Sequence, residues 1–212
     1  RKASLGNFFQ RASFLAVITA MTTSPDIRVY QHGQEWLHQA CALFRDSTAQ
    51  AIQSRGHCII ALSGGSTPKA LYGALTSADW KTQCQWDRMV FIFGDERGIP
   101  PEHPDSNFGL AQTALFRPLG IGPSQVHRMK GESADLAQAA EDYERTIRVI
   151  ARCPSPAIPR LDLVLLGLGD DGHTASLFPG TPALSERNHL VTVGQSPKGI
   201  AARLTLTLGV IN

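Results

Sequence analysis

The chain has 212 residues, enough for one domain with a sizeable core, and its 42% hydrophobic and 18% charged residues are ordinary for a globular protein. A formal net charge of +2 and the lack of any lysine or arginine run argue against a nucleic-acid partner. The most continuous apolar run, at 161–166, is too short to cross a membrane, so we expect no membrane partner.

The first twenty residues differ in composition from the rest of the chain. Residues 1–20 are basic, contain no acidic residue and end in a short apolar run from Phe14 to Ala20. A targeting segment and a packed part of the fold are two interpretations of such a stretch. Because Met21 is followed by polar residues and then by a strand-like stretch, we expect residues 1–20 to be an extension that is non-native or disordered. Residues 21–212 are expected to form a single α/β domain.

Apolar runs and helical periodicity divide the rest of the chain into strands and helices. The predicted strands are 27–31, 57–62, 86–93, 161–166, 189–193 and 203–208, with a short one at 125–129. The predicted helices are 34–55, one opening at Pro68, 107–116, and 133–152 with Ser133 as its N-cap. Strands that alternate with helices predict an α/β fold: a doubly wound, mostly parallel, Rossmann-like sheet flanked by helices.

The cysteines carry no sign of a metal or disulfide framework. They are far apart in the sequence and form no CxxC pair, and they are Cys41, Cys58, Cys84 and Cys153. We expect free, mostly buried thiols in a reducing compartment rather than disulfides or a metal site.

Four loops follow predicted strand ends and hold most of the chemically versatile residues. They are SGGSTP from Ser63, GDERGIPPEHPDSN from Gly94, GLGDDGHTASLFP from Gly167 and GQSPKGIAAR from Gly194. Parallel strands bring their carboxyl ends to one edge of the sheet, where α/β proteins bind ligands. We therefore expect the four loops to share one pocket.

The first of these loops has the features of an anion-binding turn. Gly64 and Gly65 let the backbone approach a ligand, Ser66 and Thr67 offer hydroxyls, and the following helix presents free N–H groups. The loop lacks the lysine of a Walker motif and is not a GxGxxG turn. It predicts a phosphate site, with helix capping by Ser66 and Thr67 as the alternative.

The second and third loops contain the candidates for acid–base chemistry. Asp95, Glu96 and Arg97 directly follow an apolar strand, where an arginine can hold a phosphate or stabilise an oxyanion, although solvated charges are the common alternative. His173, two residues after Asp171, is the one histidine in a glycine-rich strand-end loop, and histidine is the natural base at neutral pH. Metal binding at DDGH matches no strong ligand spacing, so we predict no metal.

Taken together, the motifs resemble one enzyme family. SGGSTPKALYGAL, FGDERGIPPEHPDSNFGLAQ, LDLVLLGLGDDGHTASLFPGTPAL and SPKGIAARLTLT, in this order, resemble the 6-phosphogluconolactonases from about Ile27 to Asn212. The resemblance implies hydrolysis of 6-phospho-D-glucono-1,5-lactone to 6-phosphogluconate, the second step of the oxidative pentose phosphate pathway, without a metal or organic cofactor. It also implies a cytoplasmic enzyme whose partner is a small sugar-phosphate lactone, and we expect a monomer.

The resemblance and the chemistry of lactones assign provisional roles. Hydrolysis needs a positioned water, a base and positive character near the carbonyl oxygen. We expect His173 to be the base, Asp95 or Asp171 to orient the imidazole or the sugar hydroxyls, and Arg97 to polarise the lactone. The residues expected to hold the 6-phosphate are Gly64, Gly65, Ser66, Thr67, Lys198 and Arg203, and the roles of Arg97 and Arg203 are interchangeable at this level. No serine or cysteine has the setting of an activated nucleophile, so no covalent intermediate is required.

Two other interpretations share the same loops. Glucosamine-6-phosphate deaminase/isomerases resemble this chain in fold and in the GGSTP loop, but they have an acid soon after the histidine, where this chain has Thr174 to Pro179, and DEY where it has Asp95 to Arg97. A non-catalytic sugar-phosphate-binding regulator is the third interpretation. Lactonases resembling this chain continue past RLTLTLGVIN, so the resemblance also implies a chain that is truncated at its C-terminus.

Overall fold

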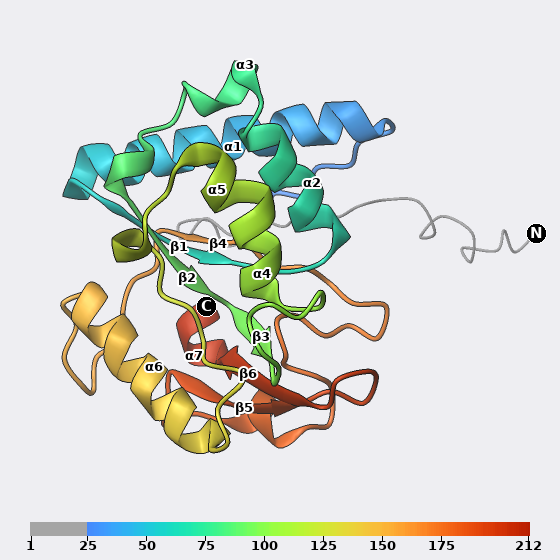
Figure 1. Ribbon diagram of the computed structural model, residues 1–212, viewed down its shortest axis with the longest axis vertical. Helices are drawn as coiled ribbons and strands as arrows, with labels where there is room; N and C mark the ends of the chain where they lie inside the picture. The colour runs from blue at the N-terminus through green and yellow to red at the C-terminus, as the bar shows by residue number, and fades with distance from the viewer. Residues whose placement is uncertain (1–24) are drawn as a thin grey trace, which may run out of the picture.

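A parallel sheet of three strands lies at the centre of the molecule (Figure 1). The computed structural model describes residues 25–212, so the predicted extension at 1–20 lies outside the described residues. Strand β1 (Cys58–Leu62) pairs with β2 (Met89–Phe93) on one side and with β4 (Leu163–Val164) on the other. Every residue of β1 is buried, as expected for the middle strand of a sheet covered on both faces.

A second, antiparallel sheet continues directly from the first. It has the order β3 (Asp95–Arg97), β6 (Ala202–Leu206) and β5 (Val191–Gln195). Gly94 joins β2 to β3: its N–H donates to the Leu62 carbonyl, and its own carbonyl accepts from the N–H of Leu206. The carboxyl end of the parallel sheet therefore leads directly into the antiparallel one.

Helices lie on both sides of the parallel sheet (Figure 1). One side has α1 (Gly33–Arg55), α2 (Ser66–Leu75), α3 (Ala78–Lys81), α4 (Asn107–Ala111) and α5 (Arg117–Leu119), the last two joined by a π-helical turn, Gln112–Phe116. The other side has α6 (Leu136–Ile150) and α7 (Leu208–Ile211). Short 3-10 turns occupy Trp86–Arg88, Pro123–Gln125 and Pro182–Ser185. None of the helices within residues 25–212 is both long and apolar enough to cross a membrane.

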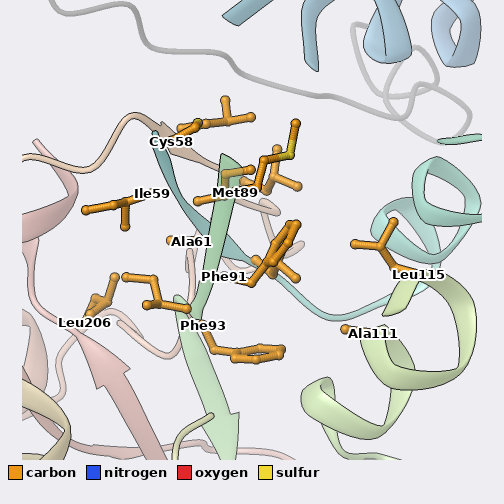
Figure 2. Close-up of a cluster of buried hydrophobic side chains, with 14 of the residues drawn as sticks. Cys58, Ile59, Ala61, Met89, Phe91, Phe93, Ala111, Leu115 and Leu206 are labelled. Carbon is orange, nitrogen blue, oxygen red and sulfur yellow. The ribbon is translucent and has the colours of Figure 1, made fainter. Parts of the chain in front are cut away.

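The core is continuous across both sheets (Figure 2). Phe91 and Phe93 of β2 point to the side of the sheet on which Leu115 and Ala111 lie, and Ile59 of β1 lies on the other side, as does Leu206 of β6. Phe93 and Phe116 are fully buried with ring centroids 6.5 Å apart. Because residues of β1, β2, β5 and β6 belong to one buried cluster, the two sheets share one hydrophobic core.

The parallel sheet flanked by helices was predicted from the sequence and is confirmed, whereas several strands differ. The predicted strand at 27–31 is wrong: this segment has no strand pairing, and Ile27 and Val29 are 71% and 65% exposed. At 125–129 a single bridge joins Val126 to Phe91. Of the predicted strand 161–166, only Leu163–Val164 form a ladder. A strand forms only where a neighbouring strand has free N–H and C=O groups. An alternation of apolar residues in the sequence does not show whether such a neighbour is there.

The last two predicted strands exist but are not parallel. β5 and β6 pair with each other antiparallel, and β3 occupies the sequence DER that we expected to be a loop. Their alternation of side chains does not distinguish parallel from antiparallel pairing, and the 196–201 connection is a short hairpin loop rather than a helical crossover. The cap of α6 was also misplaced: Asp135, not Ser133, accepts from the N–H of Gln138.

Candidate active site

All ten predicted site residues line one cavity of about 1230 Å³. They come from the four segments that follow β1, β2, β4 and β5, with Asp95 and Arg97 on β3 and Arg203 on β6, and they are Gly64, Gly65, Ser66, Thr67, Asp95, Arg97, Asp171, His173, Lys198 and Arg203. Parallel topology explains why the first three loops meet. The fourth reaches the same cavity through the β5–β6 hairpin, because β6 lies beside β3.

The SGGSTP loop forms the start of α2, and its glycines have a steric reason. A Cβ on Gly64 would lie 1.7 Å from the Asn107 side-chain oxygen, and Gly65 has φ +100°, a conformation that favours glycine. No side chain accepts a hydrogen bond as the N-cap of α2, so the capping role that was the alternative for Ser66 and Thr67 is not seen. Both residues line the cavity, so the N-terminus of α2 faces it. The free N–H groups and the positive dipole end of a helix N-terminus are suited to an anion.

Glu96 anchors the loop that leads to α4. Its buried carboxylate accepts from the backbone N–H groups of Asn107 and Phe108 at 2.8 Å and from the Ser106 hydroxyl at 3.0 Å. A carboxylate at this position satisfies N–H groups that have no partner within the helix. Glu96 is therefore neither a solvated charge nor a cavity residue: it supports the N-terminus of α4, whose N-cap is Ser106.

Asp95 is buried between two donors from different parts of the chain. One carboxylate oxygen accepts from the Asn107 amide at 2.9 Å, and the other accepts from the Ser176 hydroxyl at 2.7 Å. No hydrogen bond joins Asp95 to His173 among the described residues. Of the two candidates for orienting the imidazole, the structure places Asp171 there and not Asp95.

Arg97 and Arg203 bring two positive charges to one side of the cavity. They are paired residues on β3 and β6, and both are partly buried. Burial lowers the pKa of Arg203, and the neighbouring Arg97 lowers it further. Arg97 also donates to the Asp105 carbonyl and Arg203 to the Ile200 carbonyl, which directs the two side chains. Two adjacent guanidinium groups at a cavity favour a bound anion that offsets their repulsion.

His173 is held by three contacts. Its Nδ1 lies 2.5 Å from a carboxylate oxygen of Asp171, and its ring stacks on Phe178 with centroids 4.3 Å apart. A Cβ on Gly169 would lie 2.2 Å from the imidazole, so only glycine leaves room for the ring. The hydrogen bonds from the His173 side chain and backbone lower the pKa of the Asp171 carboxyl, which stays ionised beside the ring.

Three further residues, which were not predicted, line the cavity or hold one of its residues. Trp36 of α1 lines the cavity and had no sequence signal. Asn107, in the quoted HPDSN motif, lines the cavity and donates its amide to Asp95, and Ser176, in TASLFP, donates its hydroxyl to Asp95 from outside the lining. Among residues 25–212, no group of three or more His, Cys, Asp or Glu side chains is arranged to hold a metal, and the prediction of a metal-free site stays a prediction.

Comparison with known proteins relates this cavity to one family. A family model described as "Glucosamine-6-phosphate isomerases/6-phosphogluconolactonase" matches residues 31–212. The 6-phosphogluconolactonase of Synechocystis sp. is 40% identical over 189 residues, covering 89% of this chain and 76% of that protein. That of Nostoc sp. is 42% identical over 162 residues, covering 76% of this chain and 65% of that protein.

The fold agrees with the sequence comparison. The structure of 6-phosphogluconolactonase from Trypanosoma brucei matches with a TM-score of 0.79 at 29% identity, covering 90% of this chain and 79% of that one. The family model and the 40% identical relative each cover more than four-fifths of this chain. This chain belongs to the glucosamine-6-phosphate isomerase/6-phosphogluconolactonase family.

Proposed function

We propose that this chain hydrolyses 6-phospho-D-glucono-1,5-lactone to 6-phosphogluconate, the second step of the oxidative pentose phosphate pathway. The relatives and structural neighbours that match it over most of its length bear the name 6-phosphogluconolactonase. The observation that carries the proposal is the cavity itself, which combines an imidazole–carboxylate pair with two guanidinium groups and an open helix N-terminus. Ester hydrolysis of a phosphorylated substrate needs these three elements.

The histidine supplies the base in this proposal. Because Nδ1 contacts Asp171, Nε2 is the nitrogen left to take a proton from water. The water attacks the lactone carbonyl, and the protonated imidazole then returns its proton to the ring oxygen as the C–O bond breaks. Asp171 keeps the ring oriented and stabilises the imidazolium that forms, since its carboxyl has a lowered pKa and stays charged.

The positive side of the cavity accounts for the rest of the substrate. The α2 N-terminus with Gly64, Gly65, Ser66 and Thr67 is a site for the 6-phosphate, together with Lys198 and Arg203. Arg97 then faces the carbonyl, where it stabilises the negative charge that develops on oxygen. The pairing of Arg97 with Arg203 across β3 and β6 supports their acting on neighbouring groups of one substrate.

The test compares two reactions on the same preparation. Freshly made 6-phosphogluconolactone is followed by its removal, with the spontaneous rate subtracted, and ammonia release from glucosamine 6-phosphate is followed in parallel. Acceleration of lactone hydrolysis without ammonia release supports the proposal. Ammonia release alone would show deaminase chemistry, and binding of 6-phosphogluconate without any acceleration would show a regulator.

The location of the protein and its oligomeric state belong to the same proposal. A cytoplasmic location follows from the pathway, although some plant relatives are named chloroplastic. A monomer is consistent with a site to which one chain contributes every proposed residue. Gel filtration with light scattering tests the second of these.

A further inference from the structure

Four buried polar side chains form a continuous path beneath the cavity. The Asn107 amide donates to Asp95, the Ser176 hydroxyl donates to Asp95, and the Ser176 N–H donates to the Thr205 hydroxyl at 3.2 Å. We call these residues the Asp95 network: Asn107, Asp95, Ser176 and Thr205. All four are at least nine-tenths buried, and Asp95 and Thr205 are paired residues of β3 and β6. The network joins α4, both neighbouring strands and the histidine loop.

Ser176 is the point at which the histidine loop meets this network. Ala175, just before it, has φ +49°, a conformation that is unfavourable for a residue with a side chain. On the other side, a Cβ on Gly194 of β5 would lie 2.9 Å from the Ser176 carbonyl, so the loop packs tightly on the antiparallel sheet. Such a backbone conformation persists where the surrounding contacts hold it.

The anchored segment also carries the ring that supports the histidine. Phe178 lies two residues after Ser176, is 5% exposed and stacks on His173. The Leu177 N–H donates to the Thr174 carbonyl, which closes the turn between His173 and Phe178. A fixed Ser176 therefore holds the whole turn from His173, which carries the imidazole, to Phe178, which stacks on it.

We propose that Ser176 is a positioning residue: its hydrogen bond to Asp95 fixes the histidine loop to β3 and so sets the place of His173 relative to Arg97 and Arg203. Both oxygens of Asp95 already accept hydrogen bonds from Asn107 and Ser176, so its carboxylate serves as the fixed acceptor of the network. β3 carries Arg97, and β6, on which Thr205 lies, carries Arg203. His173, Arg97 and Arg203 are therefore held at fixed positions relative to one another, as accurate positioning of catalytic groups requires. This inference rests on the proposed function of the site.

The first experiment removes the hydroxyl and compares turnover with binding. Ser176→Ala is expected to lower kcat by about ten- to hundredfold, the size of effect that a small misplacement of a catalytic group produces, with KM changed less than about twofold. Thr48→Val is the control, because it removes another buried hydroxyl, on α1, that donates to the Arg45 carbonyl. It is expected to lower the melting temperature while leaving kcat unchanged. If Ser176→Ala does not fold, Ser176→Cys keeps the size and only a weak donor, and the same loss of kcat is expected.

A double-mutant cycle separates the Asp95 bond from other effects. Asp95→Ala removes both acceptor oxygens, so the Ser176 hydroxyl and the Asn107 amide each lose a partner. Because the Ser176 hydroxyl then has no Asp95 oxygen to donate to, the double variant with Ser176→Ala is expected to lose less activity than the product of the two single losses. Independent, multiplicative losses would overturn the proposal, as would a Ser176→Ala enzyme with wild-type kcat and a lowered melting temperature.

A readout without substrate distinguishes this inference from the proposed function. The imidazole signals of His173 in a ¹H–¹⁵N spectrum are expected to shift in Ser176→Ala and to stay in place in Thr48→Val. Unchanged signals in Ser176→Ala would overturn the positioning role. A wild-type chain that does not accelerate lactone hydrolysis would overturn the proposed function, whereas the spectra would still show whether Ser176 positions His173.

Discussion

At the scale of single residues, the orientation of His173 depends on several neighbours, of which some could be predicted from the sequence and others could not. Asp171 is two residues away and was a candidate, whereas the stacking of Phe178 and the space above Gly169 follow from the path of the backbone. The identities of the reactive groups were predictable because few residue types carry them. Which carboxylate meets the imidazole was not, because a shift of a few ångströms exchanges one partner for another.

Gly169 offers a direct test of the space around the imidazole. A Cβ at this position would lie 2.2 Å from the ring, so Gly169→Ala is expected to displace His173 and lower kcat by at least about tenfold. Gly167→Ala is the matched control, since a Cβ there has no neighbour within 4 Å. Steady-state kinetics of the two variants check this, and equal activity of both would show that the ring is not confined as described.

The carboxyl of Asp171 provides a second test at this scale. The contact with His173 lowers its pKa from an ordinary value of 3.8, so the bond is present above that pH and is lost as the pH falls through the lowered pKa. In His173→Asn the Asp171 pKa is expected to rise toward 3.8. A ¹³C titration of the carboxyl signal measures it, with Asp170, an exposed neighbour without a hydrogen bond to the ring, as reference. The same Asp171 pKa in both proteins would refute the contact.

At the scale of elements, the Glu96 carboxylate holds the N-terminus of α4 and the loop that leads to it. Glu96 is 3% exposed and accepts from three donors of residues 106–108. The next residue, Arg97, ends β3 just before the long loop, and its guanidinium donates to the Asp105 carbonyl near the end of that loop. Glu96 and Arg97 of the GDER sequence therefore hold the end of the loop beside β3.

Replacing Glu96 by Gln tests this role. The amide presents an N–H group to backbone donors, so the free energy of unfolding is expected to fall by about 1–3 kcal/mol. Urea denaturation measures the change, and Glu102→Gln, in the same loop, is the control because neither a hydrogen bond nor an ion pair of Glu102 is seen within residues 25–212. A Glu96→Gln protein as stable as the wild type would show that the hydrogen bonds of Glu96 to the start of α4 contribute nothing to stability.

Sequence patterns predicted the elements unequally for a physical reason. The long helix α1 has enough periodic residues to define a face and a glycine that ends it, and it was predicted to within a residue. A strand is defined by its partner, and the sequence does not state the partner, so IRVYQ was wrongly assigned and the antiparallel pairing of β5 with β6 was missed. The expectation that the four loops share one cavity still held, because they reach it under either pairing.

At the scale of the whole molecule, one hydrophobic core supports both sheets. It therefore supports both the loops that follow the parallel strands and the two arginines on the antiparallel strands. Phe93 ends β2 immediately before GDER, is fully buried, and its N–H donates to the Tyr143 hydroxyl of α6. Its ring lies near Phe108 of α4, with centroids 6.0 Å apart. Loss of this side chain affects the packing of elements on both sides of the sheet.

Phe93→Ala is expected to reduce the free energy of unfolding by about 3–5 kcal/mol, the usual cost of removing a buried ring. Because the core is continuous, unfolding is expected to be a single transition with the same midpoint by tryptophan fluorescence and by far-UV circular dichroism. Val149→Ala, at a position 77% exposed on α6, should change stability by less than about 0.5 kcal/mol. Separate midpoints for the two probes would show that the sheets unfold independently.

The central claim is that the four loops form one lactonase site in which His173 is the base and Arg203 holds the phosphate. The most direct measurement is kcat and KM for 6-phosphogluconolactone in the wild type, His173→Ala and Arg203→Ala, with the spontaneous rate subtracted. We predict a loss of kcat of at least about a hundredfold with little change in KM for His173→Ala. For Arg203→Ala we predict chiefly a higher KM. A His173→Ala protein that turns over at the wild-type rate would contradict the account.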